Sequence, residues 1–328
     1  MSRISVGTVT TQSYSFAFGN FFGVLGIVWL PLAIEFAGLY LLAIPYVQAL
    51  AALFQNLPQA DGRTGMPPEI AVAMQSLSRY AILFVVGSLF LRAVMMLGIT
   101  QEALGVRKGP RFAYFAIGRD VWRLFGAYFI FYILLQVAVV AIIVVVAIPS
   151  VILGVIVAVL WGNRFAHSVT GGVFVGLGIF AIAVLVYGGI LYFVMRLGFL
   201  LTPVVVVEKK IDIARVWNLS KDNAGRMFLA CLALFLPIFI VCVAMSLAAL
   251  VYAAFPAFAS LPHNASGAEF GAHMSAFFNV LLRAWFVILP VAVIFATLFY
   301  GLAGSVMTFC YRALTPPLKP LGEAPALG

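Results

Sequence analysis

Long apolar runs, separated by short segments that concentrate the charged residues, make up this sequence. A transmembrane helix needs about 20 mostly apolar residues, and six of the runs are long enough. They lie at about 21–43, 80–100, 124–148, 173–196, 227–254 and 280–309. The pattern predicts an all-α polytopic transmembrane helical bundle that forms a single domain over residues 1–312. The proline-rich tail, 313–328, is predicted to be disordered.

One stretch allows two interpretations. Residues 124–162 carry no charged side chain, and this run of 39 residues is about twice the length of one span. A second span after Pro149 would be too short, and it would place the most basic connection outside. We therefore expect one span at 124–148 and a separate apolar segment at 150–161. That segment would lie in the interface or against the bundle, with Trp161 as an interfacial anchor.

The composition agrees with a membrane protein. The 328 residues are 65% hydrophobic and 9% charged, whereas a soluble domain is about 25% charged. The net charge of +9 would suggest nucleic acid in a soluble protein. Here the basic residues lie between spans, so we expect a topological role and no nucleic-acid partner. Two of the three cysteines fall within a predicted span and the third, Cys310, at the end of another, which disfavours a disulfide framework.

The basic residues also predict an orientation. Of the 19 Lys and Arg residues, 14 lie in the N-terminal segment, the second and fourth connections and the C-terminal tail. Four lie on the opposite side, and Arg92 lies within a span. Because positive connections stay in the cytoplasm, the count predicts six crossings with both termini cytoplasmic.

The densest cluster of charge is 208–226, EKKIDIARVWNLSKDNAGR. At 100° per residue, Ile213, Ala214 and Trp217 gather on one side of a helix and polar residues gather on the other. Such a helix lies flat at the level of the lipid headgroups, and Ser220 or Asp222 is placed to cap the following span. The predicted headgroup contacts are Lys209, Lys210, Arg215, Trp217, Lys221 and Arg226.

An internal repeat is visible in the segments that lead into spans. FAFGNFFGVLGIVWLPL (16–32), FAIGRDVWRLFGAYFIF (115–131) and WNLSKDNAGRMFLACLALF (217–235) share an order of aromatic, small, polar and aromatic residues. We infer three tandem helical hairpins, each preceded by an amphipathic segment at the inner face. The alternative is that segments entering a membrane resemble one another in any case.

Groups that carry chemistry are scarce. The sequence has no P-loop, HExxH, GxSxG or CxxC motif, so we expect no catalytic residue, metal or cofactor. His263, Glu269 and His273 are spaced so that they could approach a metal, but a solvated loop is the simpler interpretation. Two pairs of glycines, Gly19/Gly23 and Gly172/Gly176, have the spacing that lets helices approach closely.

Polar groups inside predicted spans are the better functional candidates, because charge in hydrocarbon is expensive. They are Glu35, Arg92 and Gln136. Glu35 lies ~21 Å and Arg92 ~12 Å from the inner ends of adjacent spans, an offset of ~9 Å that long side chains can partly bridge. We expect Glu35 to face the bundle interior, towards the second span or a polar cavity. A proton or solute path and a purely structural ion pair both remain open.

A resemblance follows from Arg196, Pro203 and the run ARVWNLSKDNAGRMF at 214–228. An Arg that ends a span, a short apolar stretch with Pro and a basic segment leading into a span resemble the membrane domain of some glycerophosphoryl diester phosphodiesterases and the related YciC-like integral membrane proteins. The resemblance implies a bacterial inner-membrane protein. In that family the membrane part is not catalytic. We expect Arg196 to snorkel towards the headgroups.

Together these features favour a non-enzymatic membrane protein, either an envelope or lipid-associated scaffold or a partner subunit. Its partners would be membrane lipids and another membrane or envelope protein. The alternative is a transporter or permease for a small solute or lipid, favoured by the repeat and by helices interrupted at Pro31, Pro149 and Pro237. A membrane-embedded lipid enzyme would need clustered acids or histidines, which the sequence does not show.

Overall fold

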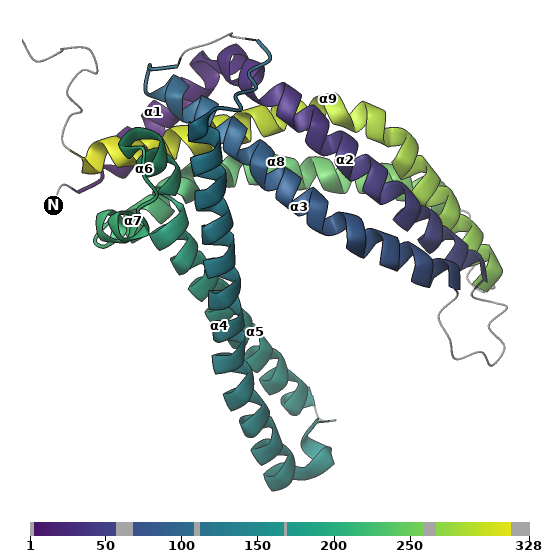
Figure 1. The fold of residues 1–328 in the computed structure, drawn as a ribbon. Helices are drawn as coiled ribbons and strands as arrows, with labels where there is room; N and C mark the ends of the chain where they lie inside the picture. Colours follow the sequence, from purple (N-terminus) through teal and green to yellow (C-terminus); the bar gives the residue numbers. More distant parts are fainter. Residues whose placement is uncertain (1–2, 57–67, 108–111, 167–168, 259–266, 316–328) are drawn as a thin grey trace, which may run out of the picture. The chain divides into compact units, whose positions relative to one another are not determined.

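The computed structural model describes residues 3–56, 68–107, 112–166, 169–258 and 267–315 (Figure 1). The described chain is organised almost entirely as helices. They are α1 (Val6–Gly19), α2 (Phe21–Asn56), α3 (Pro68–Ala103), α4 (Arg119–Ala166), α5 (Val169–Phe193), the π-helical turn η2 (Val194–Gly198), α6 (Leu201–Glu208), α7 (Ile213–Ser220), α8 (Ala224–Phe258) and α9 (Gly267–Leu314).

Six stretches of helix are long and apolar enough to cross a membrane. They are Phe21–Leu42, Tyr80–Ala103, Arg119–Val145, Phe180–Glu208, Ala224–Ala248 and Leu289–Leu314. Large apolar side chains are exposed along them, among them Val145, Phe180, Tyr187 and Phe239 at 63–73%. An apolar surface of this extent needs a lipid environment. The prediction of an all-α, six-span membrane protein is confirmed.

Two of the predicted element bounds are wrong. Part of the connection between the spans predicted at 227–254 and 280–309 is helical, because α9 begins at Gly267; Ala, Met and Glu in this stretch favour a helix. The separate segment expected at 150–161 continues α4 as helix to Ala166. Pro149 does not end α4, and within a membrane a proline is tolerated inside a helix. The side chain of Trp161 lies outside the described residues.

The chain forms two compact units. We call residues 6–122 and 229–309 the α2–α3 unit, and residues 1–5, 123–228 and 310–328 the α4–α7 unit. Each is described by itself below. The expectation of a single domain over 1–312 stays a prediction.

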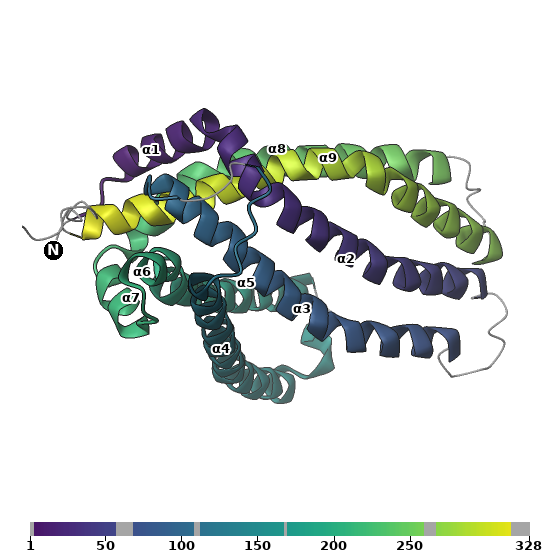
Figure 2. The same cartoon turned by 45° about the horizontal axis from the view of Figure 1, so that its top comes forward.

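In the α2–α3 unit, α2 lies beside α3, as both views show (Figures 1 and 2). α8 contacts α9 through the rings of Phe235 and Phe299, whose centroids are 4.9 Å apart. The core holds Ile27, Met95, Ile99 and Leu302, each with 0% exposure. α1 joins this unit through Tyr14, whose hydroxyl donates to the carbonyl oxygens of residues 233 and 234, at 3.2 and 3.1 Å.

Glycines bring these helices together, including two that the sequence pattern did not single out, whereas the packing of Gly172 and Gly176 lies outside the described residues. A Cβ at Gly98 would lie 2.7 Å from Ile27 Cγ2, and one at Gly304 would lie 2.5 Å from Ile99 Cγ2. A Cβ at Gly19 would meet nothing within 4 Å, and the atoms nearest to a Cβ at Gly23 belong to the side chain of the nearby Asn20. The spacing of glycines did not reveal which of them lie against a neighbouring helix.

Gly98→Ala is therefore expected to destabilise the protein by roughly 1–2 kcal/mol, because the new methyl group overpacks the contact with Ile27 and Tyr114. Gly87→Ala is the matched control in α3, since a Cβ there meets nothing within 4 Å. That change should be neutral or stabilising, because alanine favours a helix over glycine. Unfolding in mixed micelles measures both. Equal effects of the two substitutions would contradict the packing.

The α4–α7 unit contains the hairpin of α4 and α5, followed by η2, α6 and α7 (Figure 1). Leu124, Leu200, Leu201 and Val216 are fully or almost fully buried and form its core. Tyr128 of α4 is joined to Thr202 of α6 by a 2.7 Å hydrogen bond between their hydroxyls. These contacts hold the short helices against the start of α4.

The order of elements fits three hairpins: α2 with α3, α4 with α5, and α8 with α9. The segments before them differ. α1 and α7 are short helices, whereas the described part of 104–118 contains turns and non-helical backbone. One feature recurs, because Asn20 and Asn223 directly precede α2 and α8, and their carbonyl oxygens accept from the N–H groups four residues on. Whether the three hairpins superpose stays a prediction.

Candidate functional site

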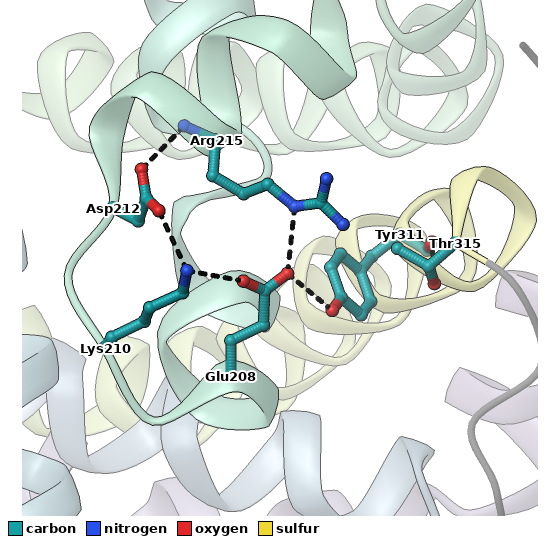
Figure 3. A network of polar contacts seen from close by, with 6 residues as sticks. All are labelled: Glu208, Lys210, Asp212, Arg215, Tyr311 and Thr315. Atoms are coloured by element: carbon teal, nitrogen blue, oxygen red, sulfur yellow. Dashed lines mark hydrogen bonds and ion pairs between the residues drawn. The ribbon is translucent and has the colours of Figure 1, made fainter.

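The polar residues of the 208–215 segment form one connected network in the α4–α7 unit (Figure 3). At its centre is Glu208, the last residue of α6, whose side chain is only 17% exposed. Glu208 Oε1 accepts hydrogen bonds from Arg215 Nε at 3.2 Å and from the Tyr311 hydroxyl at 3.1 Å. Lys210 Nζ lies 3.7 Å from Glu208 Oε2. One carboxylate thus joins the ends of α6, α7 and α9.

The turn into α7 follows from local chemistry. Lys209 ends α6 in the left-handed conformation, with φ 56°. Asp212 caps α7, because its Oδ1 accepts from the Arg215 backbone N–H at 2.8 Å. Its other oxygen, Oδ2, lies 3.0 Å from Lys210 Nζ. The turn between α6 and α7 is therefore stabilised by two acidic residues, Glu208 and Asp212, and two basic residues, Lys210 and Arg215.

These contacts shift the titration of both partners. The hydrogen bond from the Arg215 backbone N–H, with that from Lys210, lowers the pKa of Asp212 below its ordinary value of 3.8. The hydrogen bond to Asp212 raises the pKa of Lys210. Because the pKa of Asp212 is depressed in the folded state, its contribution to stability is present above about pH 4 and is lost as the pH falls through the folded-state pKa.

Asp212→Asn is expected to lower the melting temperature at neutral pH and to flatten its decline on acidification below pH 4. Asparagine still accepts the capping bond but no longer attracts Lys210. Asp222→Asn, an exposed acid in the next turn, is the matched control and should behave as wild type. Thermal unfolding in detergent from pH 3 to 7 measures this, and identical curves for both variants would contradict a contribution of the Asp212 charge to stability.

Arg196 lies beside this network, in the π-helical turn between α5 and α6. Its side chain is stacked on Trp217 of α7, with 4.0 Å from Cζ to the ring centroid, and Tyr192 lies at 5.8 Å. The Ser220 hydroxyl donates to the Arg196 carbonyl oxygen at 2.9 Å, which ties α7 to the turn. The expectation that Arg196 snorkels outwards is wrong, because the residue is only 4% exposed.

The predicted headgroup contacts divide into two groups. Lys209 and Lys221 are exposed, as are Lys210 and Arg215 despite their ion pairs. Trp217 is turned to the Arg196 guanidinium. Arg226 is partly buried and donates to the carbonyl oxygen of residue 4 at 3.2 Å. The four exposed cations lie on the surface of the unit, whereas Trp217 and Arg226 are partly buried.

Two details of the predicted α7 need correction. Val216 and Ser220 form its buried face, while Ala214, placed on that face by the periodicity, is exposed. Neither Ser220 nor Asp222 caps α8. That position belongs to Asn223, whose backbone carbonyl accepts from the residue 227 N–H and whose Oδ1 accepts from the residue 4 N–H at 3.1 Å.

The intramembrane candidates Glu35 and Arg92 meet in the α2–α3 unit, with 3.6 Å between Glu35 Oε1 and Arg92 Nη2. Glu35 is 15% exposed at its side chain and Arg92 54%, so the expected inward orientation of Glu35 is confirmed. Tyr300 of α9 lies close enough to Arg92 and Glu35 to interact electrostatically with both, which no sequence pattern indicated. Gln136 is an exposed residue of α4 and belongs to the other unit.

A second polar cluster lies at the end of α3, and the sequence interpretation missed it. Glu102 accepts from Asn20 Nδ2 at 2.9 Å and from Arg107 Nη1 at 3.1 Å. The Arg107 guanidinium lies over the Tyr114 ring, 5.2 Å from its centroid. The sequence does contain a sign of this cluster. In both units a Glu near the end of a helix is followed by its Arg partner, five residues later for Glu102 and seven residues later for Glu208.

Among the described residues, no group of three His, Cys, Asp or Glu side chains is arranged to hold a metal ion. Glu269 and His273 lie in α9, and His263 lies outside the described residues. Comparison with models of protein families, with curated proteins and with solved structures finds no match to this chain.

Proposed function

We propose that this chain is an integral protein of the bacterial inner membrane that binds anionic phospholipid headgroups at the cytoplasmic face. In this role it serves as an envelope or lipid-associated scaffold, or as the partner subunit of another membrane protein, and not as an enzyme. The resemblance of 196–228 to the YciC-like and phosphodiesterase-associated membrane domains belongs to the same proposal.

The observation that supports this function is the basic 208–226 segment at the ends of apolar helices. Its exposed cations are Lys209, Lys210, Arg215 and Lys221. A basic residue near an anionic membrane surface contributes about 1 kcal/mol of attraction. α7 buries one face in the fold and leaves the other polar, as expected of a helix lying at headgroup level.

Lipid analysis of the protein extracted in polymer nanodiscs tests the proposal. We expect anionic phospholipid to be enriched around the wild type relative to the bulk membrane. The enrichment should fall in Lys209→Gln/Lys221→Gln. Asn218→Gln, which changes an exposed neutral residue of α7, is the control. Equal lipid composition in the nanodiscs and the bulk membrane would contradict the proposal.

The orientation gives a separate prediction. In a variant whose native cysteines are replaced, an impermeant thiol reagent should label Ala265→Cys from outside intact cells, because no Lys or Arg lies between Phe258 and Arg283. Asp222→Cys, within the basic segment, should react only after lysis. The opposite labelling pattern would invert the topology.

A transport function is the second candidate, and the Glu35–Arg92 ion pair favours it. An ion pair within candidate spans is a common feature of solute and proton paths. Uptake by reconstituted vesicles would then depend on the Glu35 charge, and Glu35→Gln would abolish it while preserving the fold.

A further inference from the structure

Arg196 has an unusual environment for a charged residue. It lies in a candidate span, Phe180–Glu208, and is 96% buried, since its relative exposure is 4%. A buried cation needs a counter-charge or a full set of hydrogen bonds to be stable. No described residue forms an ion pair with it, and none accepts a hydrogen bond from its guanidinium.

The stack on Trp217 covers a face of the guanidinium but not its edge. The N–H groups of an arginine point outwards in its plane, where aromatic faces do not reach them. The Nε atom of Arg196 is buried and has no hydrogen-bond partner among the described residues. The two terminal nitrogens are not among the fully buried atoms without a partner. The remaining exposure of Arg196 therefore includes the tip, the part that donates in a fork.

Two of the three acidic residues of the 208–226 segment already accept hydrogen bonds from other residues. Glu208 accepts from Arg215 and Tyr311. Asp212 accepts from Lys210 and from the backbone of Arg215. Asp222, the third acid of the 208–226 segment, is exposed. The described part of the α4–α7 unit thus provides a largely buried cation and no counter-ion for it.

We infer that Arg196, held by Trp217 and Tyr192, is a specific binding site for a phosphate group. The fork of a guanidinium matches two oxygens of a phosphate, and the stack fixes its orientation. The phosphate belongs either to the headgroup of a phospholipid or to a soluble phosphate. The inference rests on the proposed function, because it requires this end of the unit to lie at the headgroup layer.

Native mass spectrometry of the detergent-solubilised full chain, titrated with phosphatidylglycerol, tests the site. The wild type should hold one phospholipid more tightly than the rest. Arg196→Lys, which keeps the charge but loses the fork and the stack, should weaken that binding about tenfold or more, since a charge-assisted hydrogen bond is lost. Trp217→Phe should retain most of it and Trp217→Ala should not. Circular dichroism and the melting temperature establish that each variant is folded.

Two further experiments distinguish a phospholipid headgroup from a soluble phosphate, and the Arg196 site from the proposed function. If millimolar inorganic phosphate displaces the tight lipid in the wild type but has no effect on Arg196→Lys, the ligand is a soluble phosphate at the same site. Lys221→Gln should reduce the enrichment of anionic lipid in nanodiscs and leave the tight site intact. Equal lipid binding by folded wild type and Arg196→Lys overturns the inference, whereas loss of the nanodisc enrichment alone contradicts only the proposed function.

Discussion

Replacing Arg92 with leucine is expected to destabilise the α2–α3 unit by about 2.5 kcal/mol or more. Glu35 would lose the cation 3.6 Å away and remain in an apolar span with its side chain only 15% exposed. A charged group near the centre of a transmembrane helix costs about 2.5–3.5 kcal/mol when it is unpaired. Unfolding in mixed micelles of increasing denaturing detergent measures the change.

The double variant Glu35→Leu/Arg92→Leu is the control for this prediction. Because it removes both charges, it should be close to wild type or more stable, as for other ion pairs replaced by apolar residues. Glu35→Gln alone should be mild, since its shape and hydrogen bonding are nearly kept. A double variant as unstable as Arg92→Leu would show that the loss in Arg92→Leu does not come from the unpaired Glu35 charge.

The second large effect is expected at Glu208. Glu208→Gln removes the charge that Arg215, Lys210 and Tyr311 share (Figure 3). Hydrogen bonds to charged groups contribute about 1.5–3 kcal/mol, and Glu208 is largely shielded from water. We expect a loss of stability of about 2 kcal/mol, measured by the same unfolding titration, with early loosening of the end of α9 in hydrogen exchange.

Tyr311→Phe is the matched test of that network. It removes one donor to Glu208 and should cost about 1 kcal/mol in the wild type. In a Glu208→Gln background the same change should cost less, because the charged acceptor is already gone. Full additivity of the two substitutions would mean that the Glu208–Tyr311 contact does not contribute to stability.

The fold was predictable because hydropathy is a strong and local signal. Every backbone polar group in hydrocarbon must be paired, which leaves a helix as the form for an apolar run of this length. The ends of helices were not predictable to the same degree. Pro149 suggested a break that the backbone of α4 does not make, and 267–279 looked polar enough to be a loop although its residues favour a helix.

The candidate site was predictable only where residues are neighbours in sequence or in adjacent spans. Glu35 and Arg92 lie on consecutive spans, so their pairing followed from topology. Tyr311 is 103 residues from Glu208, and no sequence pattern connects them. The burial of Arg196 depends on how α7 packs back onto the η2 turn, which a local pattern does not contain.

The most direct test of the central claim, that the basic 208–226 segment selects anionic headgroups, is electron paramagnetic resonance of spin-labelled lipids around the reconstituted protein. The ratio of association constants for phosphatidylglycerol and phosphatidylcholine should exceed one, fall in Lys209→Gln/Lys221→Gln, and decrease towards one in 1 M salt, where the screening length is about 3 Å. A ratio of one at low salt, unchanged by the substitutions, would contradict the account.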